Sequence, residues 1–137
     1  MKIADIMTRP ARTIDPETSL RGAAALMADL DTGALLVEES DRLVGMLSDR
    51  DIVVRALAQG LGAETPVRQV MSGDVRYCYE DQSVDHVAQN MADLQVRRMP
   101  VLDRQKRLVG VVSLANFARC RDDLLNATLL YGVAGSP

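Results

Sequence analysis

The chain has 137 residues, of which 16 are Lys or Arg and 19 are Asp or Glu, so its formal net charge is −3. Apolar residues make up 47% and charged residues 26%, values that exclude a disordered chain and collagen and allow one domain, or two small ones, with a buried core. The mild acidity lacks the basic face that nucleic acid or an anionic membrane would require, so we expect neither as a partner.

The first half of the chain is predicted to contain two helices and three strands. Ser19 is a suitable N-cap, and the apolar residues that follow it recur at helical spacing on one face. Two later apolar runs have strand length and are separated by polar residues that suit a hairpin. The predicted elements, in chain order, are a strand at 12–14, a helix at 20–30, strands at 34–37 and 43–47, and a helix from Asp49 to near Gly60.

The second half is predicted to repeat this order. Ser83 stands in the same position relative to the apolar pattern as Ser19 does. The predicted elements are a strand at 76–78, a helix at 84–94, strands at 99–102 and 108–112, and a helix that begins near Leu114. Each half therefore has the order β-α-β-β-α.

The similarity between the halves extends to individual residues and indicates a tandem duplication. A shift of 64 positions places residues 6–8 on residues 70–72, and the four residues Met-Ala-Asp-Leu at 27–30 recur identically at 91–94. We place a one-residue insertion near Gln95, after which the shift is 65. The predicted divisions are repeat 1 at 1–60, a linker at 61–65, repeat 2 at 66–121 and a tail at 122–137 whose leucines predict a further helix.

The repeat predicts the fold class. A unit of roughly 55 residues is marginal alone, because its surface is large relative to its core. We therefore expect an α/β (α+β) protein in which two tandem β-α-β-β-α repeats pack sheet to sheet with pseudo-two-fold symmetry.

These motifs resemble the CBS domain family, named after cystathionine β-synthase, in its tandem-pair form, the Bateman module. The resemblance rests on Ile6-Met7-Thr8, on Thr13-Ile14 ahead of a Ser-capped helix, and above all on the segments 45–51 and 110–116. The compact pair is similar to small free-standing bacterial CBS proteins that carry no enzyme or transporter domain. The resemblance implies a regulatory, non-enzymatic module that senses a ligand in the cleft between the repeats.

The implied ligand is an adenine nucleotide or a related adenosyl compound. The candidates are AMP, ADP, ATP, S-adenosylmethionine and NAD(H), and no cofactor is expected to be required. The resemblance also implies a homodimer formed through helical faces, with an unidentified protein target as a further candidate partner.

Ser48 and Asp51 are the first candidate ligand-binding pair. A strand is predicted to end at Ser48 and a helix to begin, so free backbone N–H groups and the Ser hydroxyl can face an anion. The Asp51 carboxylate can accept hydrogen bonds from both ribose hydroxyls, and the resemblance assigns phosphate and ribose contacts to these two positions. Ser-x-x-Asp is also the pattern of a helix capping box, which needs no ligand.

The second repeat departs from the family pattern at Asn116, where the family usually has Asp. Ser113 matches Ser48, but the Asn116 amide lacks the charge assistance that a carboxylate gives to a hydrogen bond. The two sites are therefore expected to be unequal, with Asp51 contributing more to binding than Asn116.

Basic residues also differ between the repeats. Arg97 and Arg98 stand where related proteins commonly have phosphate-binding residues, or they form a solvated pair near a helix C-terminus. The first repeat has Thr32 and Gly33 there, so its phosphate would depend on Arg50 or on the helix terminus.

The resemblance assigns the base of the ligand to the first strand of each repeat and to the strand after the first helix. Tyr77 could stack on a purine or fill part of that space. The projected residues are Thr13, Ile14, Ala34 and Leu35 in repeat 1, and Tyr77, Cys78, Met99 and Pro100 in repeat 2.

Two other functions stay open. One is a dimerising interaction protein with empty, degenerate clefts, and the other is a thiol-responsive or metal-responsive switch that uses Cys78, Cys120 and His86. The cysteines form no CxxC or Cys/His cluster, so reduced thiols are expected. No stretch reaches the roughly 18 apolar residues that span a bilayer, and Asp5 interrupts any signal core, so we expect a cytoplasmic protein.

Overall fold

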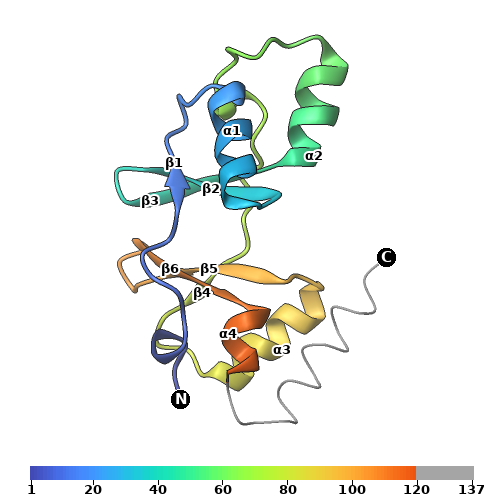
Figure 1. The fold of residues 1–137 in the computed structure, drawn as a ribbon. Helices are drawn as coiled ribbons and strands as arrows, with labels where there is room; N and C mark the ends of the chain where they lie inside the picture. The colour runs from blue at the N-terminus through green and yellow to red at the C-terminus, as the bar shows by residue number, and fades with distance from the viewer. Residues whose placement is uncertain (120–137) are drawn as a thin grey trace. The chain divides into compact units, whose positions relative to one another are not determined.

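The computed structural model describes residues 1–119 and contains two three-stranded sheets with helices (Figure 1). It confirms the predicted mixed α/β class. The described chain divides into two compact units: Arg12–Val75, here the repeat-1 unit, and Met1–Ala11 together with residues 76–119, here the repeat-2 unit. The predicted tail helix lies outside the described residues.

The repeat-1 unit has strand order β1-β2-β3, with β1 parallel and β3 antiparallel to β2. Helices α1 and α2 lie on the same face of this sheet (Figure 1). Its elements are β1 (Thr13–Ile14), α1 (Leu20–Leu30), β2 (Ala34–Glu39), β3 (Arg42–Ser48) and α2 (Asp49–Asp51), which continues as a π-helical turn η2 (Ile52–Ala56) and a 3₁₀ turn η3 (Leu57–Gln59), followed by a 3₁₀ turn η4 (Val67–Gln69).

The repeat-2 unit has the equivalent order β4-β5-β6 with the same parallel and antiparallel pairings. Its elements are a 3₁₀ turn η1 (Ile3–Asp5), β4 (Cys78–Tyr79), α3 (Val84–Leu94), β5 (Arg98–Leu102), β6 (Leu108–Ser113) and α4 (Leu114–Ala118). No described helix is long and apolar enough to cross a membrane.

The first helix of each repeat has the predicted bounds because its cap works as expected. The Ser19 hydroxyl accepts a hydrogen bond from the Gly22 N–H at 3.1 Å, and the Ser83 hydroxyl accepts one from the His86 N–H at 3.3 Å. Each hydroxyl satisfies a backbone donor that the helix itself leaves free. Both helices end at a residue in the left-handed region.

The first eleven residues, here the N-terminal segment, belong to the repeat-2 unit. The Ile3 N–H donates to the Gln82 carbonyl at 2.9 Å, and Thr8 pairs with Val111 through two backbone hydrogen bonds of 2.8 and 3.0 Å. The segment therefore extends the sheet of the other repeat rather than its own.

Residues 66–75, here the middle segment, make the equivalent contacts with the repeat-1 unit. The Val67 N–H donates to the Thr18 carbonyl at 2.8 Å, and Ser72 and Met46 exchange two backbone hydrogen bonds of 2.9 Å. Each repeat thus contributes its leading segment to the unit of the other repeat.

Gly45 and Gly110 allow these segments to approach the sheets. A Cβ added at Gly45 would lie 2.6 Å from Met71 Sδ, and one at Gly110 would lie 2.7 Å from the Thr8 carbonyl oxygen. Side-chain carbons do not tolerate such distances. The two motif glycines therefore have a packing role that needs no ligand.

The buried core of each unit includes residues of the segment that crosses to it. Ile3 and Met7 pack in the repeat-2 unit, and Val67 and Val70 in the repeat-1 unit. Burying one such side chain stabilises the folded protein by about 2 kcal/mol relative to leaving it exposed. Each segment is therefore part of the core of the unit that it joins.

The strand registers correct the position of the inserted residue. We placed it near Gln95, but Ala34 pairs with Ser48 as Arg98 pairs with Ser113. The shift is therefore still 64 at the start of the strand, and the extra residue lies in the β5–β6 hairpin. A hairpin loop accommodates an insertion without disturbing the sheet pairing on either side.

Candidate functional site

Ser48 and Asp51 form a reciprocal capping box where β3 meets α2. The Asp51 N–H donates to the Ser48 hydroxyl at 3.0 Å, and the Ser48 N–H donates to Asp51 Oδ2 at 2.9 Å. These are the contacts that the capping interpretation requires. The pair is only partly buried, so it remains accessible from solvent.

The capping box leaves polar groups of this pair available. Asp51 Oδ1 lies 3.9 Å from Arg55 Nη1, beyond hydrogen-bond distance, and the Asp51 side chain is 21% exposed. Among the described residues, the Ser48 hydroxyl makes one hydrogen bond, in which it is the acceptor, so its own hydrogen remains available. The pair can therefore offer a carboxylate oxygen and a hydroxyl donor to a ligand.

The sheet brings Ala34, a projected residue of repeat 1, next to this pair. Ala34 pairs directly with Ser48, and cross-strand partners have Cβ atoms about 5 Å apart. Ile14 and Leu35 are instead buried in the core. Thr13, at the start of β1, is half-buried.

Arg50 is exposed, and its backbone N–H donates to Asp49 Oδ1 at 2.8 Å. The Asp49 N–H donates to the Gly33 carbonyl at 2.9 Å. Sequence reasoning missed Arg55, which stands one helical turn after Asp51 and forms an ion pair with it; its i,i+4 spacing was the available signal.

Ser113 and Asn116 occupy the equivalent position in the repeat-2 unit but bond differently. Asn116 Oδ1 accepts from the Ser113 N–H at 2.8 Å and lies 2.9 Å from the Ser113 hydroxyl. Asn116 Nδ2 donates to the Ile6 carbonyl at 2.8 Å and to Thr8 Oγ1 at 3.1 Å. Asn116 is 3% exposed, so this amide is a buried connection to the N-terminal segment.

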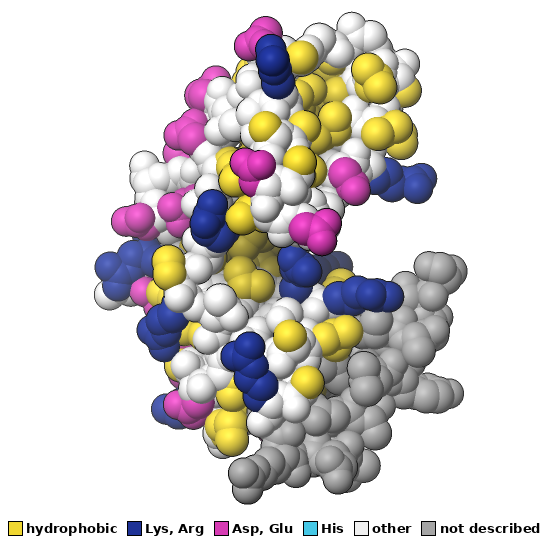
Figure 2. Space-filling model, in the orientation of Figure 1, with side chains coloured by type: hydrophobic (Ala, Val, Ile, Leu, Met, Phe, Trp, Pro, Cys, Tyr) yellow, Lys and Arg dark blue, Asp and Glu magenta, His cyan; other side chains and the backbone are white. Residues whose placement is uncertain are grey.

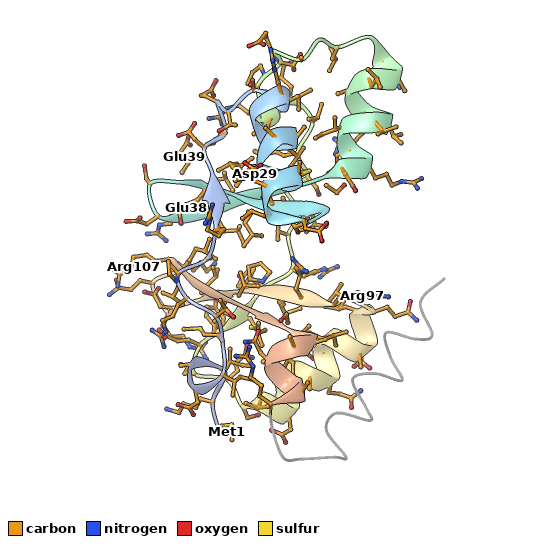
Figure 3. The ribbon with its side chains drawn as sticks, viewed as in Figure 1. Met1, Asp29, Glu38, Glu39, Arg97 and Arg107 are labelled. Atoms are coloured by element: carbon orange, nitrogen blue, oxygen red, sulfur yellow. The ribbon has the colours of Figure 1, made fainter. Side chains whose placement is uncertain are left out.

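Arg97 and Arg98 lie where α3 connects to β5, at the end of the sheet opposite Arg107 (Figure 3). Both are exposed. With the corrected alignment they match Gly33 and Ala34, not Thr32 and Gly33. Arg98 therefore stands beside Ser113 in the place that Ala34 takes beside Ser48.

The projected base-binding residues of repeat 2 are divided between core and surface. Cys78, Met99 and Pro100 are buried, whereas Tyr77 is 40% exposed and packs edge-to-face on Tyr79, with ring centroids 5.6 Å apart. This aromatic contact covers part of the Tyr77 ring. A ligand-binding role for these residues stays a prediction.

Tyr79 also makes a cation–π contact. The Arg104 guanidinium lies 4.1 Å from its ring centroid and donates two hydrogen bonds of 2.8 Å to Asp81. These bonds lower the pKa of the Asp81 carboxyl. This cluster is a surface ion pair stacked on an aromatic ring.

The thiol and metal candidates have local partners. Burial raises the pKa of Cys78 to about 12, and its thiol lies 3.7 Å from the Pro100 carbonyl oxygen. His86 Nε2 lies 3.3 Å from the amide of Asn90, one turn along α3. Within residues 1–119, no three His, Cys, Asp or Glu side chains are placed to hold a metal ion. Cys120 lies outside the described residues.

The repeat-1 unit also carries an apolar surface that sequence reasoning missed. Val53, Val54 and Leu57 are 56%, 44% and 70% exposed, and Figure 2 shows hydrophobic side chains over this part of the molecule. Beside them lies a groove of about 220 Å³ between α1 and the turns after α2, lined by Leu20, Arg21, Ala24, Ile52, Ala56, Leu57, Leu61, Gly62 and Ala63.

Comparison with known proteins identifies the family. The family model described as "CBS domain" matches residues 3–57 and 67–123. The chain is 40% identical over 116 residues to the CBS domain-containing protein YhcV of Bacillus subtilis, covering 85% of this chain and 82% of that protein. It is 38% identical over 117 residues to hypoxic response protein 1 of Mycobacterium tuberculosis, covering 84% and 81%.

Solved structures agree. Hypoxic Response Protein I with two coordinated zinc ions superposes with a TM-score of 0.76 at 36% identity, covering 87% of this chain and 98% of the other. The CBS domain pair of protein MJ0100, in complex with 5′-methylthioadenosine and S-adenosyl-L-methionine, gives a TM-score of 0.70 at 30% identity, covering 87% and 94%. With two matched domains that include most of its length, the chain belongs to the CBS domain family as a tandem CBS pair.

Proposed function

We propose that this protein is a regulatory module that binds an adenine nucleotide or adenosyl compound through Ser48 and Asp51, and that it is not an enzyme. The observation that carries the proposal is Asp51 Oδ1, a carboxylate oxygen on a partly exposed side chain that makes no hydrogen bond within the described chain and only a 3.9 Å ion pair with Arg55. It can accept from ribose hydroxyls while Oδ2 keeps its capping bond to Ser48.

The surroundings of Asp51 support this assignment. The Ser48 hydroxyl adds a donor, and Ala34 opposite it carries only a methyl group. Arg50 and Arg55 are exposed cations, one immediately before Asp51 and one a helical turn after it. The complex of the MJ0100 CBS pair with two adenosyl compounds supports the ligand class.

A thermal-shift screen of purified, nucleotide-free protein against AMP, ADP, ATP, S-adenosylmethionine and NAD(H) tests the proposal. A ligand at 100 times its dissociation constant stabilises the protein by about 2.7 kcal/mol, so at least one should raise Tm. Asp51→Asn keeps an acceptor for the Ser48 N–H but removes the charge, and should weaken the response.

Asp49→Asn is the matched control, because Asp49 is an exposed carboxylate two positions away whose side chain, among the described residues, accepts a hydrogen bond from the adjacent Arg50 N–H. It removes the same charge from the same turn and should keep the shift. No shift with any ligand, or equal loss in both variants, would contradict the proposal.

The apolar surface supports a homodimer, the assembly expected from the family resemblance. Exposed Val53, Val54 and Leu57 beside an apolar groove form a patch of the kind that marks protein interfaces. We propose that a second copy covers it. Dimerisation is compatible with ligand binding, and it is also the whole function if the ligand screen is negative.

A further inference from the structure

The hydrogen bonds of Asn116 use the full capacity of its amide. Oδ1 faces both the N–H and the hydroxyl of Ser113, and Nδ2 donates to Ile6 and to Thr8. An amide oxygen accepts two hydrogen bonds and an amide nitrogen donates two. A ligand would therefore have to displace a buried internal bond.

The Ser113 hydroxyl hydrogen is also used in an internal hydrogen bond. The hydroxyl lies 2.9 Å from Asn116 Oδ1, and an amide oxygen can only accept, so the Ser113 hydroxyl must be the donor. In the repeat-1 unit the Ser48 hydroxyl instead accepts from the Asp51 backbone N–H, and its hydrogen has no acceptor among the described residues. The two Ser positions match in sequence but differ in what they can offer.

Asn116 also makes contacts that a carboxylate could not make. Asn116 donates to Ile6 and Thr8 of the N-terminal segment, whereas a carboxylate in its place would have no hydrogen to donate at neutral pH.

We infer that Asn116 holds the N-terminal segment in place instead of binding a ribose, and that the protein takes one adenosyl ligand per chain, at the Ser48–Asp51 position. The stoichiometry rests on the proposed function, whereas the holding role does not. Arg98 beside Ser113, in the place of Ala34, adds to the difference by putting a long side chain where repeat 1 has a methyl group.

The holding role is tested without a ligand, by amide hydrogen exchange measured by NMR on the full chain. The Thr8 N–H donates to Val111 at 2.8 Å and the Ala4 N–H donates to Glu80 at 2.9 Å. In Asn116→Ala both amides should exchange at least tenfold faster than in the unmodified protein. Unchanged exchange in a folded variant would overturn the inference.

Two further variants control this experiment. Thr8→Val removes one acceptor of Asn116 at an exposed position and should accelerate exchange of the same amides, by a smaller factor than Asn116→Ala. It keeps the inference testable if Asn116→Ala does not fold. Asn90→Ala removes an amide from the surface of α3 and should leave exchange in the N-terminal segment unchanged; acceleration there would overturn the specific role of Asn116.

Isothermal titration with AMP, ATP and S-adenosylmethionine tests the stoichiometry. One ligand per chain, lost or weakened at least tenfold in Asp51→Asn, is the expected result. Two ligands per chain would overturn the single-site inference while leaving the proposed function intact. No binding by any of the three, together with no shift from ADP or NAD(H) in the thermal-shift screen, would overturn the proposed function, and the exchange experiment would still decide the role of Asn116.

Discussion

The side-chain amide of Asn116 donates to the hydroxyl of Thr8, 3.1 Å away and 108 positions earlier in the chain. This bond joins the last described helix to the N-terminal segment. Asn116 is a buried hydrogen-bond donor at a position where a carboxylate would have no hydrogen to give at neutral pH.

Replacing Asn116 by Asp should therefore destabilise the protein at neutral pH. The introduced carboxylate has no hydrogen to donate to the Ile6 carbonyl, and an acceptor left without its donor inside the protein costs about 2 kcal/mol. Burial against the Ile6 carbonyl raises the folded-state pKa of the introduced carboxyl above its unfolded value of about 4. The stability it contributes is then greatest below pH 4 and is lost as the pH rises through the folded pKa.

Urea unfolding of Asn116→Asp and the unmodified protein at pH 4.5 and 7.5 measures this difference. The stability gap should be smaller at pH 4.5, where protonation restores one donor. A gap of equal size at both pH values would show that the amide hydrogens of Asn116 do not stabilise the N-terminal segment.

Alanine at Gly110 or Gly45 should destabilise the protein by about 2 kcal/mol, because the new Cβ meets the Thr8 carbonyl or the Met71 side chain. The two variants should be affected to a similar extent, because a Cβ at Gly45 would also lie 2.9 Å from the Ser72 carbonyl oxygen and one at Gly110 would also lie 2.9 Å from Met7 Sδ. Gly62→Ala is the control, because nothing lies within 4 Å of a Cβ added there. Equal stability of all three variants in chemical denaturation would exclude the close approach of the N-terminal and middle segments to the two sheets.

Cys78 should be inert to thiol reagents in the folded protein. Burial raises its pKa to about 12, so the reactive thiolate is absent near neutral pH. In a Cys120→Ser variant, Ellman's reagent at pH 8 should label no thiol until urea unfolds the chain, and then one. Rapid labelling of the native variant would revive the thiol-switch hypothesis.

The same pKa shift has a consequence at alkaline pH. Because the folded-state pKa of Cys78 lies above the unfolded value, the stability contributed by the protonated thiol is fully present below about pH 8.5 and is lost as pH rises toward 12. A Cys78→Ala variant should show a weaker decline of Tm between pH 9 and 11 than the unmodified protein. Parallel declines would show that another group causes the alkaline loss.

An acidic residue at Leu57 should weaken self-association. Leu57 is 70% exposed beside the apolar groove, and a charge buried without a partner at an interface costs several kcal/mol. Sedimentation velocity should show Leu57→Asp shifted toward monomer, while Gln69→Asp, which adds the same charge at another exposed position of the unit, stays dimeric. A monomeric unmodified protein, or two variants that behave alike, would exclude this surface as the interface.

The helices at 20–30 and 84–94 could be predicted with their bounds because their signals are local: a Ser cap and apolar residues at helical spacing. The pairing of Thr8 with Val111 and of Ser72 with Met46 could not, since it joins one repeat to the other and leaves no local pattern. The inserted residue was misplaced for a related reason. Side-chain similarity alone did not distinguish a change near Gln95 from one in the hairpin, whereas strand pairing does.

The candidate site was predicted in part. Ser48 and Asp51 were identified as a pair with two alternative roles, and the capping contacts are present, while ligand binding stays a proposal. Asn116 was interpreted from its missing charge alone, because its partners Ile6 and Thr8 lie at the far end of the sequence. The buried positions of Ile14 and Leu35 follow from strand alternation, which places neighbouring residues on opposite faces.

The most direct test of the central claim is the affinity of nucleotide-free protein for AMP, ATP and S-adenosylmethionine, compared between Asp51→Asn and Asp49→Asn by isothermal titration. The account predicts saturable binding of at least one of these ligands, weakened at least tenfold by Asp51→Asn and left within about twofold by Asp49→Asn. Binding of none of them, or the same loss in both variants, would contradict it.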